Sequence, residues 1–334
     1  MKRELEILLI VIVSLLFLFI LKDIDFLEVY YLINNLSLFY FTLAFLSCLI
    51  TFLLWNIRWK NTLKELIDAN YWYILIILFA GVFINTITPG ASTGGEPVRA
   101  YFLSKKYNKP KTELFGSIVA DKFFNLAVFL LFVVFSIVFI FIYVEISPRL
   151  KILLETILAS IILSSLVVIF LLWKKIKFKV DWISEKFYRL KSVKKHFKTP
   201  EEFKNYVNKK IKNFLGVFNS IILNKKKFWF GIFISIIYWL FLYLSSYFLF
   251  ISLNSQINFL SLIVVVTLSH LIGDISPVPG GIGLTEGTMF LLYSAMGVSP
   301  PIAIVVSLLS RIIYYFFSLL MGGLSLIYLR FTLK

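Results

Sequence analysis

Long apolar runs are the feature that most constrains what this chain can fold into. They lie at about 7–21, 36–59, 71–88, 114–144, 152–173, 228–253, 259–275 and 301–329. An α-helix of about 20 residues crosses the hydrocarbon core of a bilayer. None of the runs alternates as a strand of a membrane barrel does. We therefore predict an all-α polytopic membrane protein with about eight hydrophobic helical segments.

The composition supports one membrane domain and no soluble one. Sixty per cent of the residues are hydrophobic and 16% are charged, which is too little polar surface for a soluble fold of this length. With one cysteine and two histidines, the chain lacks the ligands of an ordinary zinc site. We predict a single transmembrane domain over residues 1–334, without a cofactor, whose first run is an uncleaved span.

Basic residues predict the orientation, because Lys and Arg concentrate in cytoplasmic loops. The segment 174–227 has seventeen Lys and Arg against four Asp and Glu, so we place it in the cytoplasm. The opening MKRE and the closing RFTLK are also basic. The sequence thus predicts a multi-pass protein of the cell membrane with both termini cytoplasmic.

Simple counting of spans contradicts this orientation unless the chain makes an extra return between 71 and 111. The segment TPGASTGGEPVRAYFL (88–103) offers the place, because its prolines and glycines break a helix. The following half-helix, 96–104, would span only about 14 Å. We predict a re-entrant hairpin that opens to the cytoplasm, and a second one at SPVPGGIGLTEGTMFLLYSAMG (276–297).

An offset of 190 residues aligns the two hairpins without a gap. It places Pro89 on Pro279, Gly90 on Gly280, Glu96 on Glu286 and Asp121 on Arg311. Inverted repeats whose broken helices meet near the midplane are common in secondary transporters. The prediction is an inverted repeat, with one copy at about 1–145 and the other at about 150–330.

Six ionisable residues fall at membrane depth, where charges are costly and commonly functional. They are Glu96, Arg99, Asp121, Asp274, Glu286 and Arg311. One interpretation is that they only neutralise one another, for example as the pairs Arg99–Asp121 and Glu286–Arg311. The other, which we favour, is that they line a polar cavity for a charged headgroup.

The glycines of the hairpins are further candidates for the pathway. They would let the backbone turn at membrane depth and admit a headgroup to two helix N-termini, near 94–96 and 284–286, which suit a phosphate. The alternative is that Glu96 and Glu286 themselves cap those ends. The candidate glycines are Gly90, Gly94, Gly95, Gly280, Gly281 and Gly283.

Three weaker signals remain. GASTG (90–94) matches the G-x-S-x-G nucleophile pattern but lies between apolar helical segments, which argues against catalysis. His270 and Asp274 share a helix face, as a core hydrogen-bonded pair or as a proton relay. In 174–227, aromatic and aliphatic residues recur at helical spacing among lysines, which predicts an amphipathic helix on anionic lipid rather than nucleic-acid binding.

The two Pro-Gly…Glu hairpins also resemble the flippase-like transmembrane family. The segments are NTITPGASTGGEPVRAYFLSKKYNKPKTELFGSIVADKFFN and PVPGGIGLTEGTMFLLYSAMGVSPPIAIVVSLLSRIIYY. That family includes the membrane region of lysylphosphatidylglycerol synthase, the multiple peptide resistance factor. The resemblance extends over about 5–330 and implies movement of lipid between leaflets. Because the chain stops at Lys334, without the aminoacyl-transferase domain, we expect no lysyl transfer.

Our functional prediction is a lipid flippase or transporter for an anionic amphiphile. The alternatives are an integral membrane enzyme that acts on lipid headgroups and a non-transporting scaffold for enzymes of lipid or glycan assembly. The absence of a nucleotide motif, a metal cluster or a credible triad disfavours an enzyme. The expected partners are membrane lipids, anionic ones in particular, and enzymes of lipid or glycan assembly, and we expect no binding of nucleic acid.

Overall fold

The computed structural model describes residues 25–88, 94–143, 188, 193, 197 and 199–332. The predicted spans at 7–21 and 152–173 therefore lie outside the described residues. Within the described ranges, every element is helical and no strand occurs, which confirms the predicted all-α membrane fold.

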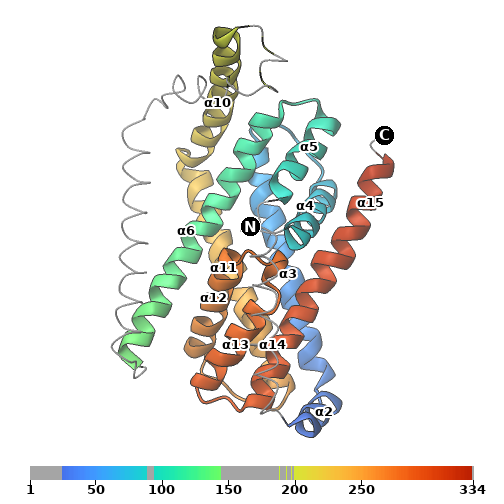
Figure 1. The fold of residues 1–334 in the computed structure, drawn as a ribbon, viewed down its shortest axis with the longest axis vertical. Coiled ribbons are helices and arrows are strands. Elements are labelled where there is room, and N and C mark those ends of the chain that lie inside the picture. The colour runs from blue at the N-terminus through green and yellow to red at the C-terminus, as the bar shows by residue number, and fades with distance from the viewer. Residues whose placement is uncertain are drawn as a thin grey trace.

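In the described part of the chain, four helices are long and apolar enough to cross a membrane. They are α3 (Leu38–Leu63), α6 (Lys111–Tyr143), α11 (Lys225–Ser252) and the continuous run Pro300–Thr332. The last of these comprises α14 (Pro300–Tyr315), a π-helical segment η2 (Phe316–Met321) and α15 (Gly322–Thr332). α3 and α11 pack together along most of their length, and Ser245 Oγ donates to the Ala44 carbonyl oxygen at 2.8 Å. A short helix, α2 (Phe26–Asn34), precedes α3 at the lower end of the bundle (Figure 1).

Two helical hairpins reach only partway through the bundle, as predicted. α4 (Tyr71–Ile87) enters from the upper end in Figure 1 and α5 (Gly95–Tyr107) returns there. α12 (Phe259–Ile275) enters from the lower end, and α13 (Leu284–Ala295) returns after a short 3₁₀ turn, η1 (Pro279–Gly281). α5 has 13 residues and spans about 20 Å, so it is longer than the half-helix 96–104 that we predicted.

The two hairpins begin in the same way and meet at their tips. Asn70 accepts hydrogen bonds from the first two backbone N–H groups that follow Tyr71, and Asn258 caps α12 in the same manner. At the other end, η1 contacts α4, and a Cβ added at Gly280 would lie 3.1 Å from the Thr86 carbonyl oxygen. The tips therefore touch near the middle of the bundle.

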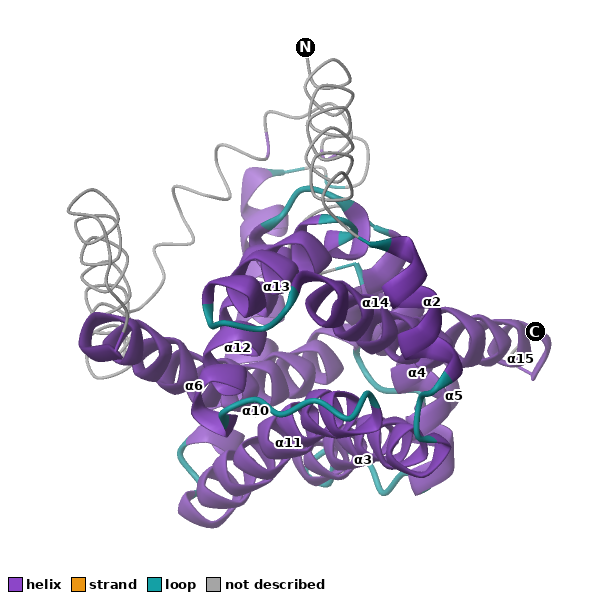
Figure 2. Cartoon of the chain, turned by 90° about the horizontal axis from the view of Figure 1, so that it is seen from below, coloured by secondary structure: helices purple, strands orange, loops and turns teal. Residues whose placement is uncertain are grey.

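The described helices have the arrangement of an inverted repeat. The offset of 190 residues carries α3, α4, α5 and α6 onto α11, α12, α13 and the α14–α15 run, to within three residues at each bound. Each element runs opposite to its counterpart (Figure 1). Seen from below, α3 and α11 occupy one side of the bundle, and α13 and α14 the other (Figure 2). The repeat boundaries at about 1–145 and 150–330 stay predictions.

The predicted amphipathic helix is present as α10 (Pro200–Ile222). Thr199 caps it and accepts a hydrogen bond from the Glu202 backbone N–H at 3.1 Å. Its apolar face packs on α6 rather than standing free, with the Phe214 ring 6.2 Å from that of Phe115. α10 thus lies beside α6 at the upper end of the bundle (Figure 1).

Candidate functional site

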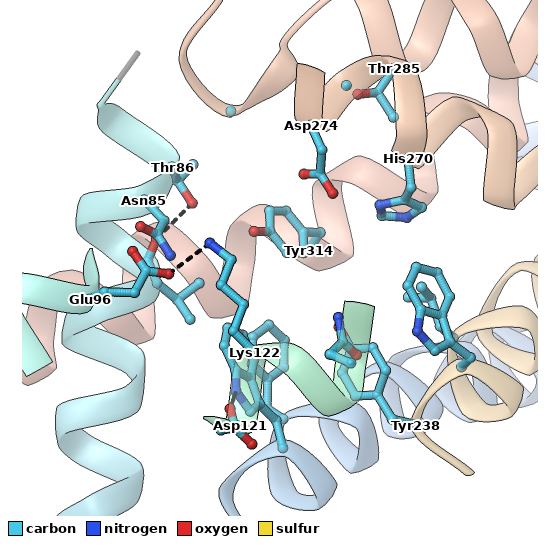
Figure 3. A pocket seen from close by; sticks show the side chains of 18 of the residues that line it. Asn85, Thr86, Glu96, Asp121, Lys122, Tyr238, His270, Asp274, Thr285 and Tyr314 are labelled. Atoms are coloured by element: carbon cyan, nitrogen blue, oxygen red, sulfur yellow. Dashed lines mark hydrogen bonds and ion pairs between the residues drawn. The ribbon is translucent and has the colours of Figure 1, made fainter. Parts of the chain in front are cut away.

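A polar cavity of about 170 Å³ lies where the hairpins meet. Its wall includes residues of both hairpins and of the long helices α3, α6, α11 and α14. Four cationic side chains and three carboxylates line it, namely Arg58, Arg99, Lys122, Arg311, Glu96, Asp121 and Asp274. Figure 3 shows Glu96 and Asn85 on one side of the cavity, and Asp274, His270 and Thr285 on the other.

Glu286 of the second hairpin is paired with Arg311 of the following helix, α14. Arg311 Nε donates to Glu286 Oε1 at 2.9 Å, which confirms the predicted pair. Glu286 Oε2 accepts the Gly283 backbone N–H at 2.7 Å and so caps α13. Arg311 Nη2 donates to the Gly280 carbonyl oxygen and to the Tyr315 hydroxyl. The N-terminus of α13 is therefore occupied by Glu286, as our alternative interpretation held.

Asp121 does not pair with Arg99, and that prediction was wrong. Arg58 Nε donates to Asp121 Oδ1 at 2.7 Å, and Trp55 Nε1 donates to Asp121 Oδ2 at 2.8 Å. Arg58 Nη1 also donates to Ser235 Oγ at 2.8 Å on α11. Both oxygens of Asp121 thus accept a hydrogen bond from α3. Arg58 escaped the sequence reasoning because it lies near the end of an apolar run, where Arg commonly reaches the interface.

Arg99 is buried without full satisfaction of its donors. Its side chain is 1% exposed, and neither Nε nor Nη1 has an acceptor among the described residues. The nearest carboxylate oxygen, Glu96 Oε1, lies 3.6 Å from Nη2. The guanidinium instead lies over two indole rings, 5.4 Å from the centroid of Trp55 and 4.9 Å from that of Trp59. Arg99 is therefore held in place by aromatic faces while two of its nitrogens lack a partner.

Glu96 faces the cavity and pairs with a residue that the sequence reasoning missed. Lys122 Nζ, reaching across from α6, donates to Glu96 Oε1 at 3.0 Å (Figure 3). Glu96 Oε2 is buried and lacks a donor in the described part of the chain. Glu96 does not cap α5, because the Asn85 side-chain oxygen accepts the Gly95 backbone N–H at 2.5 Å. The first hairpin thus differs from the second in how its helix end is satisfied.

Three of the hairpin glycines, Gly94, Gly95 and Gly281, lie in close packing, and their role in a pathway stays a prediction. A Cβ on Gly95 would overlap the Gly81 carbonyl oxygen, and one on Gly94 would overlap the Thr88 hydroxyl. Gly281 has a φ of +64°, and a Cβ there would lie 2.9 Å from Gly273 Cα. Gly95 and Gly281 need to be glycine because neighbouring backbones come into contact there, whereas a Cβ on Gly94 would meet the Thr88 side chain.

The other glycine positions divide into three cases. Gly280 lines the cavity and offers its carbonyl oxygen to Arg311. Gly283 precedes α13 and donates to Glu286. Gly90 and most of the GASTG motif, 90–93, lie outside the described residues.

His270 and Asp274 both line the cavity, one turn apart on α12 (Figure 3). The His270 ring meets that of Trp239 edge to face, with centroids 5.9 Å apart. The pair therefore borders the cavity, and a hydrogen bond between the two side chains stays a prediction. A role in proton relay stays a prediction. Among the described residues, no group of three or more potential metal ligands occurs.

Comparison with known proteins gives the family. A sequence profile described as the lysylphosphatidylglycerol synthase TM region matches residues 6–322. A UPF0104 membrane protein of Methanothermobacter thermautotrophicus is 28% identical over 82% of this chain and 81% of its own. UPF0104 membrane proteins of Pyrococcus horikoshii and Methanocaldococcus jannaschii are also 28% identical, over 84% and 87% of this chain and 84% and 85% of theirs. The chain belongs to the family of the lysylphosphatidylglycerol synthase transmembrane region.

Proposed function

We propose that this membrane protein moves an anionic amphiphile between the two leaflets, with the headgroup passing through the cavity between the hairpin tips. The observation that carries the proposal is Arg99, whose Nε and Nη1 are buried at the cavity without an acceptor in the described residues. An unsatisfied buried donor costs about 1–3 kcal/mol, and more when it is charged. A phosphate or other anionic group in the cavity would remove that cost.

The charges around Arg99 favour an anion over a cation. Arg99 and Lys122 share Glu96, whereas Asp121 is occupied by Arg58, and Arg311 by Glu286. Arg99 on α5 and Lys122 on α6 therefore place two cations around the single carboxylate of Glu96, and Asp274 is a further carboxylate of the cavity wall. Guanidinium groups bind phosphate well because their planar donors match its oxygens. The Trp55 and Trp59 rings fix Arg99, so that little side-chain entropy is lost when an anion binds.

The position of the cavity suits transport better than a surface site would. Hairpins from opposite ends meet there, as in transporters whose substrate site lies at the interface of inverted repeats. On this proposal the protein lies in the cell membrane with both termini cytoplasmic, its partners are anionic lipids, and it is not an enzyme. The basic last turn of α5 and the lysines along α10 would then face the cytoplasmic leaflet.

Lipid movement in reconstituted vesicles tests the proposal. The purified protein is placed in phosphatidylcholine vesicles with a trace of fluorescent phosphatidylglycerol, and the rate at which the probe exchanges leaflets is measured with an impermeant quencher. Arg99→Gln should slow exchange at least about tenfold, because hydrogen bonds to charged groups contribute about 1.5–3 kcal/mol. Arg330→Gln is the matched control, since Arg330 is exposed at the end of α15.

Three other outcomes would contradict the proposal. Equal exchange by wild type and Arg99→Gln would remove Arg99 from the pathway. No exchange by folded wild-type protein would favour a scaffold for lipid or glycan assembly enzymes. A changed mass of the lipid after incubation would favour an enzyme that acts on headgroups.

A further inference from the structure

A second hollow lies between α5, α6 and α10, apart from the central cavity. Its volume is about 510 Å³, within the range of roughly 300–1,000 Å³ that is typical of small-molecule sites. Most of its wall is apolar, formed by Pro97, Ala100, Phe115, Ile211 and Phe214. We call these residues, with the polar ones named below, the α10 groove.

The α10 groove is held open by specific contacts between α10 and α6. Asn213 Nδ2 donates to Glu113 Oε1 at 3.0 Å. A Cβ on Gly116 would lie 2.8 Å from the Phe214 carbonyl oxygen, so α10 approaches α6 closely at this point. Because these contacts fix the distance between the two helices, the groove is preformed rather than a gap that neighbouring side chains can fill.

Two lysines and one hydroxyl add polar groups to this apolar wall. Lys111 Nζ lies 4.9 Å from the ring centroid of Tyr101, and Lys210 Nζ lies 5.1 Å from that of Tyr206. Both lysines line the groove. Thr112 also lines it, and its hydroxyl is buried without a hydrogen-bond partner in the described ranges. The groove therefore combines an apolar floor with two lysine residues whose ammonium groups lie near Tyr101 and Tyr206.

We propose that the α10 groove binds one anionic phospholipid of the surrounding leaflet. An acyl chain occupies the apolar floor, and the phosphate lies at the rim of the groove, where Lys111 and Lys210 supply the positive charge. A hydrocarbon chain fits the apolar floor better than a soluble peptide does, because a peptide backbone carries polar groups. The proposal does not depend on translocation, because a lipid bound here needs only the membrane setting of the chain.

Native mass spectrometry of protein released from nanodiscs tests this. The nanodiscs contain equal amounts of phosphatidylglycerol and phosphatidylcholine, and retained lipids are counted for each variant. Every variant is also made on an Arg99→Gln background, so that lipid in the central cavity does not contribute. Lys111→Gln with Lys210→Gln should reduce retained phosphatidylglycerol about tenfold. The matched control is Lys209→Gln with Lys212→Gln, which removes the same charge from exposed positions of α10.

Ile211→Trp tests the acyl-chain part separately. The larger side chain should fill the groove and reduce retention of phosphatidylglycerol while both lysines remain, and circular dichroism checks that the helices persist. If the control variant, Lys209→Gln with Lys212→Gln, loses as much retained phosphatidylglycerol as Lys111→Gln with Lys210→Gln, the lipid is attracted to the basic surface in general. That result would overturn the proposal. Full retention by folded Ile211→Trp would also overturn it. Dimers that form without lipid and are lost in Ile211→Trp would assign the groove to a second copy of the chain.

Discussion

The two hairpins have helices of similar length, but their buried glutamates have different partners. α4 and α12 each have 17 residues, and α5 and α13 have 13 and 12. Both returning helices carry a buried glutamate in their first turn. In the second hairpin that glutamate caps the helix and pairs with Arg311. In the first, Glu96 pairs with Lys122 and leaves Arg99 with two unpartnered nitrogens among the described residues.

The difference follows from one pair of equivalent positions. The offset of 190 residues places Asp121 on Arg311, so the charge next to the hairpin has opposite sign in the two halves. Arg311 can neutralise Glu286, whereas Asp121 cannot neutralise Glu96 and instead takes Arg58 as its partner. One half of the repeat is therefore closed by its own charges. In the other half, Arg99 keeps two donors without an acceptor among the described residues.

The largest expected effect is a loss of stability when the Glu286–Arg311 pair is broken. Arg311→Gln should lower the free energy of unfolding by about 3–5 kcal/mol, because Glu286 is left as an uncompensated buried charge. Adding Glu286→Gln should cost less than the sum of the two single changes. Unfolding in mixed micelles, followed by tryptophan fluorescence, measures both. Strictly additive losses would mean that the pair does not stabilise the hairpin.

An intermediate effect on stability and on lipid exchange is expected when the Arg99 side chain is displaced. A Cβ on Gly81 would lie 2.6 Å from Arg99 Cγ, so Gly81→Ala should displace the side chain and cost about 1–3 kcal/mol of stability. The rate at which fluorescent phosphatidylglycerol exchanges between leaflets should fall in the same variant. The control is Gly323→Ala, whose added Cβ would meet only the Phe83 ring, at 3.6 Å. Unchanged exchange in Gly81→Ala would show that the precise place of Arg99 is unimportant.

Arg99→Gln should change stability by less than about 1 kcal/mol, in contrast with Arg311→Gln. Its Nε and Nη1 have no hydrogen bond to lose in the described structure, and Glu96 keeps Lys122 as its partner. The change also removes a buried charge, which offsets lost contacts with the indole rings. Denaturant unfolding of both variants in the same micelles checks this. A loss as large as that in Arg311→Gln would make the two hairpins equivalent.

The smallest effect is expected for Lys122→Gln. The Lys122 side chain is 45% exposed, and pairs of this kind contribute about 0.2–1 kcal/mol. The unfolding midpoint should therefore shift only slightly, and less at high salt, because screening already weakens the pair. A large, salt-independent shift would mean that Glu96 depends on Lys122 as strongly as Glu286 depends on Arg311.

The sequence predicted the architecture because the relevant signals are local. Runs of apolar residues give the helices, and Pro89, Gly95 and Pro279 lie at or next to the hairpin breaks. The Glu286–Arg311 pair was also predictable, since both residues lie at membrane depth in consecutive segments. The partners of Asp121 were not predictable. Arg58 and Ser235 are brought to it by the contact of α3, α6 and α11, which no local pattern encodes.

The role of the hairpin glycines was also not predictable from the sequence. A glycine that gives room to a ligand and one that allows two backbones to touch have identical letters in a sequence. Only the position of Gly81 opposite Gly95 shows that this pair serves helix contact.

The most direct test of the central claim is the position of a bound headgroup. Cryo-electron microscopy of the protein in phosphatidylglycerol nanodiscs, with a bound antibody fragment to aid alignment, would locate it. We predict phosphate density within hydrogen-bonding distance of Arg99 Nε or Nη1, and none at the N-terminus of α13, where Glu286 accepts the Gly283 N–H. A phosphate at α13 with Glu286 displaced, or an empty cavity around Arg99 in lipid-loaded protein, would contradict the account.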